Sequence, residues 1–229
     1  MTVGRKPFSE SKIAQKRANI IDNLESFLIE NGSIDFDITM EDLAKRSRIA
    51  KGTIYLYFPT KEELFFTYYL KTLEIKMDLM LEKLSTGESN LTRFDNFLNF
   101  YYQFFKQYPH YLKIQLYFEN NTKKMEKIPE SLWKKYSEIG KITHDLIEGI
   151  YRGCIEEGSF REDLDIRLTF HSINTILRST IKFCLFNFSN HVLEVVHNET
   201  PENFYYNLIN LLIHGLKNNK LKHIMTTKS

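Results

Sequence analysis

A short stretch near the N-terminus, Lys51–Phe58 (KGTIYLYF), combines residue types that bind a nucleic-acid backbone. Lysine neutralises phosphates, and tyrosine hydroxyls donate hydrogen bonds to phosphate oxygens. If the stretch is helical, 100° per residue places Ile54 and Phe58 together, facing the core. Gly52 and Leu56 then point outward, where glycine allows close approach to a duplex and leucine can contact a thymine methyl. We therefore expect the outer face of this helix to enter the major groove.

Other side chains around that face extend the expected contacts. Lys51 and Lys61 are expected on phosphates, and the amide-rich start of a helix at Lys61 offers a further phosphate site. Thr53 is expected to form a hydrogen bond with a base edge, and the hydroxyls of Tyr55 and Tyr57 are expected to donate hydrogen bonds to phosphate oxygens. The alternative for the two tyrosines is that they only pack the core of a small domain.

The hydrophobic spacing predicts helices along almost the whole chain. Apolar residues recur at three- and four-residue steps, and no segment alternates as a strand would. Thr39-Met-Glu-Asp42 and Thr60-Lys-Glu-Glu63 have the residue order of capping boxes. Helices are expected at about residues 11–31, 39–47, 50–57, 60–84, 91–107, 110–125, 130–157, 165–188 and 202–218, with a linker at 85–90. The fold class is therefore all-α, and the two short helices form a helix-turn-helix.

Composition sets further limits. The 229 residues are 42% hydrophobic and 26% charged, as in ordinary globular proteins, and they contain only two cysteines, as expected in a reducing cytoplasm. No apolar run approaches the roughly 18 residues of a membrane span, and no secretory signal is visible. Net charge is only +2, but its signs separate into blocks. Residues 1–17 carry five bases and one acid, residues 18–42 seven acids and no base, and residues 43–61 five bases and no acid. The blocks indicate either a basic face for phosphates or an ordinary solvated helical surface.

At these residues the chain resembles the DNA-binding domain of the TetR (tetracycline-repressor-like) family. The resemblance covers roughly residues 15–65, and its core is Thr39-Met40, Leu43-Ala44, Lys51–Tyr55, Tyr57-Phe58 and Lys61–Leu64. It implies a homodimer that binds a near-palindromic operator on double-stranded DNA and usually represses until a small molecule binds. It also implies a helix-turn-helix domain at 1–65 and an effector-binding and dimerisation domain, a helical bundle, at 66–229. Family DNA-contact positions are occupied here by Thr39, Lys51, Gly52, Tyr55, Tyr57 and Lys61.

Two residues depart from the family pattern. The family often has glycine where this chain has Arg48, and serine where it has Ala50. An arginine in the left-handed conformation destabilises the fold by about 1 kcal/mol. An alanine in place of serine loses the side-chain hydrogen bond that caps the following helix, which is worth a similar amount. Neither change removes a phosphate contact, and Arg48 is expected to add one.

An aromatic concentration marks the expected effector site. Residues Phe94–Phe118 include 11 Phe or Tyr among 25 positions, and such interiors can hold an apolar or aromatic ligand. The expected ligand-binding residues are Tyr101, Tyr102, Phe105, Tyr117, His171, Asn174 and Arg178. Arg178 and His171 would anchor a polar or acidic group. The alternatives are plain core packing for the aromatic residues, and an acidic partner within the chain or solvent for Arg178.

The last two long helices carry apolar seams, which the family resemblance assigns to a dimer bundle. The expected interface comprises Ile173, Leu177, Ile181, Phe204, Leu208, Leu211 and Gly215. Burial of each seam inside the monomer is the alternative.

Catalysis, metal binding and a cofactor are not expected. The seven histidines show no metal-ligand spacing, and the chain has no P-loop, GxGxxG, GxSxG or HExxH motif. Two rival functions stay open: a small-molecule binding protein with a vestigial helix-turn-helix, and an enzyme whose site is assembled from distant residues of a helical bundle.

Overall fold

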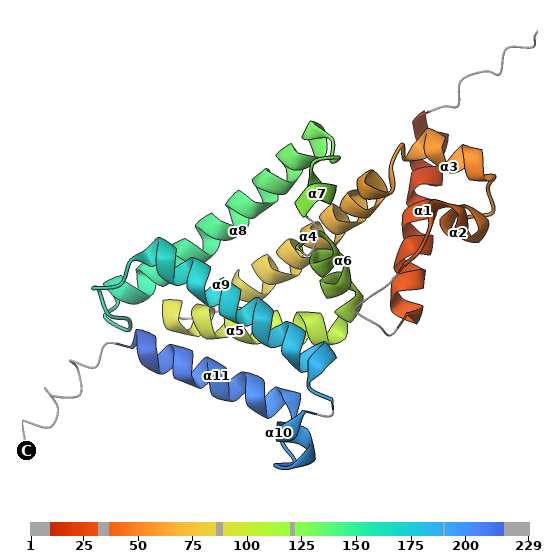
Figure 1. Cartoon of the computed structure of the whole chain (residues 1–229). Coiled ribbons are helices and arrows are strands. Elements are labelled where there is room, and N and C mark those ends of the chain that lie inside the picture. The colour runs from red at the N-terminus through yellow and green to blue at the C-terminus, as the bar shows by residue number, and fades with distance from the viewer. Residues whose placement is uncertain (1–9, 32–36, 86–88, 120–121, 190, 218–229) are drawn as a thin grey trace, which may run out of the picture. The chain divides into compact units, whose positions relative to one another are not determined.

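The computed structural model describes residues 10–31, 37–85, 89–119, 122–189 and 191–217, and these are helical almost throughout (Figure 1). The elements are α1 (Glu10–Glu30), α2 (Met40–Arg46), α3 (Lys51–Tyr57), α4 (Lys61–Ser85), α5 (Asn90–Gln107), α6 (Pro109–Glu119), α7 (Thr122–Met125), α8 (Glu130–Glu156), α9 (Ile166–Lys182), the π-helical turn η1 (Phe183–Asn187), α10 (Val192–Val195) and α11 (Pro201–Leu216). The described residues contain no β-strand, so the all-α prediction is confirmed. None of the helices in this part of the chain has the length and apolar character needed to cross a membrane.

Most helix boundaries fall within two residues of those expected, with three differences. The segment expected as one helix at 110–125 contains α6 and α7, and residues 120–121 between them lie outside the described part of the chain. The helix expected at 165–188 changes to π-helix after Lys182, and α10 was not expected. Residues 86–88 of the expected linker, and residues 1–9 of the N-terminal basic block, lie outside the described part of the chain.

The chain packs as two compact units. Unit 1 comprises Met1–Thr72 and His110–Lys135, and unit 2 comprises Leu73–Pro109 and Tyr136–Ser229. α4 therefore contributes to both units, and α6 from His110 onward belongs to unit 1. The functional division at residue 65 stays a prediction, since packing and function need not divide a chain at the same place.

In unit 1, α1, α2 and α3 pack on one another (Figure 1), and side chains of α6 contact α1. Lys113 of α6 is 4% exposed, and its ammonium donates hydrogen bonds to the carbonyls of Leu28 and Asn31 at the C-terminal end of α1. Burial lowers the pKa of Lys113. These carbonyls have no partner within an α-helix, so Lys113 acts as a cap supplied by a distant helix.

A second polar contact joins the same helices. The Glu25 carboxylate of α1 accepts hydrogen bonds from Tyr111 Oη and Lys71 Nζ, each at 3.1 Å. His110 Nε2 lies 3.6 Å from the same carboxylate. The contact with His110 is the largest cause that lowers the pKa of Glu25, from an ordinary 4.5 to about 2, and Lys71 and Tyr111 add to it while burial opposes it.

Glu25→Gln is expected to destabilise unit 1 by about 1–3 kcal/mol at neutral pH. Because the pKa of Glu25 is lower in the folded state, its contribution is complete above about pH 4.5 and disappears as pH falls to about 2. The difference between variant and parent should therefore shrink over that window. Trp133, the only tryptophan, packs 5.2 Å from Phe66 in unit 1, so its fluorescence during urea unfolding reports the change. The exposed pair Glu30–Arg46 supplies the control: Glu30→Gln should leave the midpoint unchanged, and an equal shift for both variants would contradict the assignment.

In unit 2, α5 packs against α9 and α11. Tyr205 of α11 is fully buried, and its hydroxyl donates a 2.6 Å hydrogen bond to the Leu98 carbonyl of α5. Tyr102 stacks on Tyr205 with ring centres 4.6 Å apart. Thr200 caps α11, and Pro201 occupies its first turn.

Candidate nucleic-acid interface and regulatory sites

The turn between α2 and α3 fixes the geometry of the helix-turn-helix. Arg48 has φ 54°, so the predicted left-handed conformation is confirmed. Its amide donates to the Lys45 carbonyl at 3.1 Å, and the Ile49 amide donates to the Ala44 carbonyl at 3.0 Å. This is the Schellman arrangement, in which glycine usually takes the left-handed position. Ala50 supplies no side-chain cap to α3, also as predicted.

Arg48→Gly is expected to raise stability by up to about 1 kcal/mol, because glycine adopts the left-handed conformation without strain. Operator affinity should fall at the same time, since a predicted phosphate contact is lost. Arg48→Ala separates the two effects: it removes the charge but keeps the strain, so affinity should fall without a gain in stability. Urea denaturation and DNA titration of both variants make the comparison, and a less stable glycine variant would contradict it.

The two faces of α3 are as predicted. Ile54 and Phe58 are fully buried, whereas Leu56 is 76% exposed and Tyr55 43% exposed. Gly52 is exposed, and a Cβ atom there would meet nothing of the described structure within 4 Å. The outward face is therefore open to a large partner at Gly52, Tyr55 and Leu56, with Thr53 half-buried beside them.

Tyr57 differs from the prediction that it flanks the outer face, because its side chain is only 7% exposed. Tyr57 lies on the side of α3 between the buried face and the exposed face, and the domain core covers most of its ring. Its main role is therefore packing, which was the alternative, and a phosphate contact through its hydroxyl stays a prediction.

Arg17 of α1 holds the end of the recognition helix. Its guanidinium lies 4.1 Å from the centre of the Phe58 ring and donates a hydrogen bond to the Tyr57 carbonyl at the C-terminal end of α3. It also pairs with Glu63 of α4 at 3.5 Å. Sequence reasoning missed this role, although Arg17 recurs in step with the apolar residues of α1, which is the signal of an inward-facing cation.

Several predicted backbone contacts gather around one surface hollow. It is lined by Thr39, Met40, Glu41, Lys51, Tyr55, Thr60, Lys61 and Glu62. The Thr39 hydroxyl is engaged in a capping box with Asp42 that starts α2, as the residue order predicted. Lys51 and Lys61 line the hollow as cations, each beside a carboxylate: Glu41 lies 2.8 Å from Lys51, and Asp37 lies 3.3 Å from Lys61.

The expected ligand-binding aromatic residues fall in different surroundings. Tyr101, Tyr102 and Phe105 are buried in unit 2, where burial raises the pKa of Tyr102 to about 12. Tyr117 belongs to unit 1 and packs on Phe65 with ring centres 4.9 Å apart. Lys76 of α4, which sequence reasoning did not select, lies 5.7 Å from the Tyr101 ring centre and 5.5 Å from that of Phe105.

The expected polar anchors lie along α9. His171 and Arg178 are exposed, and Asn174 is half-buried with its amide on the Phe170 carbonyl. The His171 ring lies 5.9 Å from that of His144. Among the described residues, no group of three or more His, Cys, Asp or Glu could hold a metal ion. Lys76 and Lys106 are thus cations in contact with buried aromatic residues of α5, whereas His171 and Arg178 are exposed on α9.

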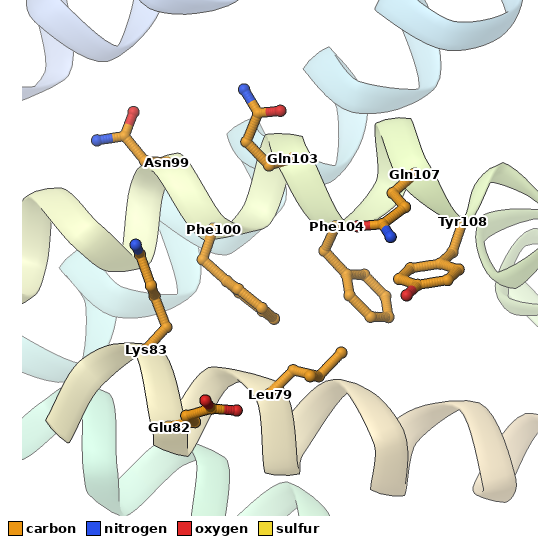
Figure 2. Close-up of a pocket in the computed structure, with 9 residues that line it drawn as sticks. All are labelled: Leu79, Glu82, Lys83, Asn99, Phe100, Gln103, Phe104, Gln107 and Tyr108. Atoms are coloured by element: carbon orange, nitrogen blue, oxygen red, sulfur yellow. The ribbon is translucent and has the colours of Figure 1, made fainter. Parts of the chain in front are cut away.

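A groove of about 520 Å³ runs between α4 and α5 in unit 2. Figure 2 shows Phe100, Phe104 and Tyr108 reaching from the α5 side toward Leu79 of α4. The rim is polar and consists of Glu82, Lys83, Asn99, Gln103 and Gln107. An apolar floor with a few polar groups and a volume of 300–1,000 Å³ is typical of small-molecule sites. The groove uses the face of α5 opposite to the one that sequence reasoning selected.

The α9 seam lies inside the monomer. Ile173 is 5% exposed, and Leu177 and Ile181 are fully buried, so their expected place on a dimer surface has to be corrected. The helical period indicates that a face is buried but not whether the covering helix belongs to the same chain. The stated alternative therefore holds for these three residues.

The outer face of α9 and α11 remains exposed instead. Leu168 is 69% and Leu211 62% exposed, and both line a surface groove with Ser172, Ile176, Leu212 and Gly215. Phe204 and Leu208 are half-buried on α11. Large exposed leucines beside a small residue are typical of a surface that another helix covers.

Comparison with known proteins agrees with this arrangement. Residues 35–68 match the model of the bacterial regulatory proteins of the tetR family. A fatty acid metabolism regulator protein of Bacillus subtilis is 26% identical over 80% of this chain and 97% of its own length. The structure of FadR from Bacillus subtilis in complex with stearoyl-CoA has a TM-score of 0.62 at 20% identity, covering 87% of this chain and 98% of that chain.

Other solved structures share the fold. The ketosteroid regulator KstR2 of Mycobacterium tuberculosis has a TM-score of 0.61 at 16% identity, over 89% of this chain and 95% of that chain. A putative regulator from Saccharomonospora viridis in complex with choline has a TM-score of 0.68 at 13% identity, over 90% of this chain and 100% of that chain. Residues 35–68 therefore carry the segment that defines the tetR family of bacterial regulatory proteins, and the chain shares the fold of solved transcriptional regulators over most of its length.

Proposed function

We propose that this regulator is a repressor, which binds a palindromic operator as a homodimer and leaves it when an apolar effector binds. The observation that carries the proposal is the open outer face of α3, with Gly52, Tyr55 and Leu56 exposed beside Lys51. Thr39, Arg48, Thr53, Tyr57 and Lys61 complete the proposed contact set. Residues 1–65 form the DNA-binding domain and residues 66–229 the regulatory domain. The function involves no catalysis, and the place of action is the cytoplasm, where bacterial DNA lies.

The proposed effector is a long-chain acyl thioester of coenzyme A. Two findings support this class: the relative that regulates fatty acid metabolism, and the related fold that binds stearoyl-CoA. Aromatic side chains supply apolar walls, and burying an acyl chain releases about 25 cal/mol per Å². A long chain can thus provide the several kcal/mol of differential affinity that release from DNA requires.

The α4–α5 groove is the proposed place of the acyl chain, and it lies on the face of α5 opposite to the aromatic residues selected from sequence, Tyr101, Tyr102 and Phe105. Lys76 is the proposed partner of the anionic portion, in preference to Arg178, His171 and Asn174. Lys76, Leu79 and Lys83 follow at three and four residues along α4 and so share one face of that helix, and Leu79 and Lys83 line the groove. Because α4 begins at Lys61 in unit 1 and ends in unit 2, a ligand that displaces it reaches both units through one continuous helix.

The test of function starts from DNA. A duplex selected by the protein from a random pool should be a palindrome, and its binding should weaken as salt rises. Stearoyl-CoA should release the protein from this duplex, whereas coenzyme A alone should not. Failure to select any sequence would overturn the proposal that the protein is a DNA-binding regulator. Release by small polar compounds alone would overturn the proposal that the effector is an acyl thioester.

Filling the groove tests the site. Leu79→Trp is expected to raise the stearoyl-CoA concentration needed for half-release by about tenfold or more, because the indole occupies the floor, while operator affinity changes less than about twofold. Leu81→Trp is the matched control: Leu81 is similarly exposed on the same helix, at 38%, but does not line the groove. Equal responses of the two variants would exclude the groove as the effector site.

A further inference from the structure

The acidic block at residues 18–42 supplies a carboxylate to each of two lysines that are proposed to bind phosphates. Glu41 Oε2 lies 2.8 Å from Lys51 Nζ, and Asp37 Oδ1 lies 3.3 Å from Lys61 Nζ. Both pairs belong to unit 1 and lie at or beside the hollow under the outer face of α3. The free protein thus holds these ammonium groups against its own carboxylates.

Each lysine has to exchange a carboxylate for a phosphate when the protein binds DNA. Pairing lowers the pKa of Glu41, chiefly through its hydrogen bond from Lys51, and raises the pKa of Lys51, so both groups are charged at neutral pH. After the exchange, Glu41 keeps a second cation, Lys45 at 3.3 Å, and Asp37 is 90% exposed to water. Each carboxylate therefore still has a cation or water to stabilise its charge, but both remain negative charges close to the DNA backbone.

We propose that Glu41 and Asp37 are built-in competitors for the phosphate-binding lysines, and that they limit the affinity of the protein for DNA. This inference rests on the proposed DNA contacts of Lys51 and Lys61. The competition acts on the backbone contact, so it lowers affinity for operator and non-operator duplexes alike. A lower affinity in turn reduces the differential binding that an effector needs in order to release the operator.

Two variants test the proposal independently. Glu41→Gln and Asp37→Asn should each bind a selected operator and a scrambled duplex more tightly than the parent does, by about threefold per subunit at 50 mM salt. The plot of log affinity against log salt should steepen by up to about 0.9 per subunit, so that the gain largely disappears by about 200 mM. Fluorescence anisotropy over a salt series measures both quantities.

The matched control is Glu30→Gln. It removes one acid from the same unit by breaking the 2.8 Å pair with Arg46, which is not a proposed contact, and it should leave affinity and slope nearly unchanged. If it tightens binding as much as Glu41→Gln does, the effect is net charge alone and the proposal fails. Unchanged or weaker binding by both test variants also overturns it.

A double-mutant cycle separates this inference from the proposed function. In a Lys51→Ala background, Glu41→Gln should lose most of its gain, because the lysine it competes for is absent. A full gain in that background would overturn the competition. If Lys51→Ala itself binds DNA like the parent, the proposed contact is wrong. If Lys51→Ala weakens binding and Glu41→Gln has no effect, the contact stands and only the competition is overturned.

Discussion

Gly215→Arg is expected to convert the dimer into a folded monomer and to lower operator affinity by at least about 100-fold. A monomer contacts one half-site and loses the millimolar effective concentration that a second linked contact provides. Gly215 lies on the exposed side of α11 in the groove that contains Leu211, and a Cβ atom there would meet nothing of the described chain within 4 Å. The arginine therefore fits the monomer and acts only where a second subunit approaches.

Gly215→Ala is the matched control for this prediction. Alanine adds a single methyl group and should raise helix stability by about 1 kcal/mol without introducing a charge. Analytical ultracentrifugation at micromolar concentration, with DNA titration, compares the two variants. If the parent protein is itself a monomer at that concentration, or if Gly215→Arg stays dimeric and binds operator normally, α11 does not form the interface.

The local geometry of the helix-turn-helix could be predicted because short-range rules determine it. The left-handed Arg48 followed from the family resemblance, because the family often has glycine at this position and glycine suits a left-handed turn. The exposed Leu56 and buried Ile54 followed from the period of one helix. Such features depend on residues within one or two turns of each other, which a sequence displays directly.

The partners of each helix could not be predicted in the same way. The buried Leu177 and the exposed Leu211 are both apolar residues in helical seams, and only the packing of α9 and α11 distinguishes them. Lys113 looks like an ordinary surface lysine within the apolar α6, yet it is 4% exposed and caps α1. Contacts between residues about 80 positions apart depend on the fold as a whole, so the hydrophobic period of a single helix cannot predict them.

Lys51→Ala is expected to weaken operator binding by about tenfold per subunit near 0.1 M salt, hence about 100-fold for the dimer. Each neutralised phosphate contributes about 0.9 to the slope of log affinity against log salt, so the slope should become shallower by about 2 for two subunits. The loss should be similar for operator and scrambled duplexes, because phosphates carry no sequence information. Thermal melting should stay close to that of the parent, since Lys51 is an exposed side chain whose pairing with Glu41 contributes little to folding.

Lys45→Ala provides the comparison that isolates the contact from general charge. Lys45 and Lys51 both pair with Glu41, at 3.3 Å and 2.8 Å, but only Lys51 lies at the start of the recognition helix. Both substitutions remove one positive charge and one partner of the same carboxylate. Lys45→Ala should therefore change affinity and slope much less than Lys51→Ala does. If the two variants lose affinity equally, Lys51 contributes only to the overall electrostatic field of the domain and does not contact a phosphate. The N-terminal end of α3 is then not the end that lies against the DNA backbone.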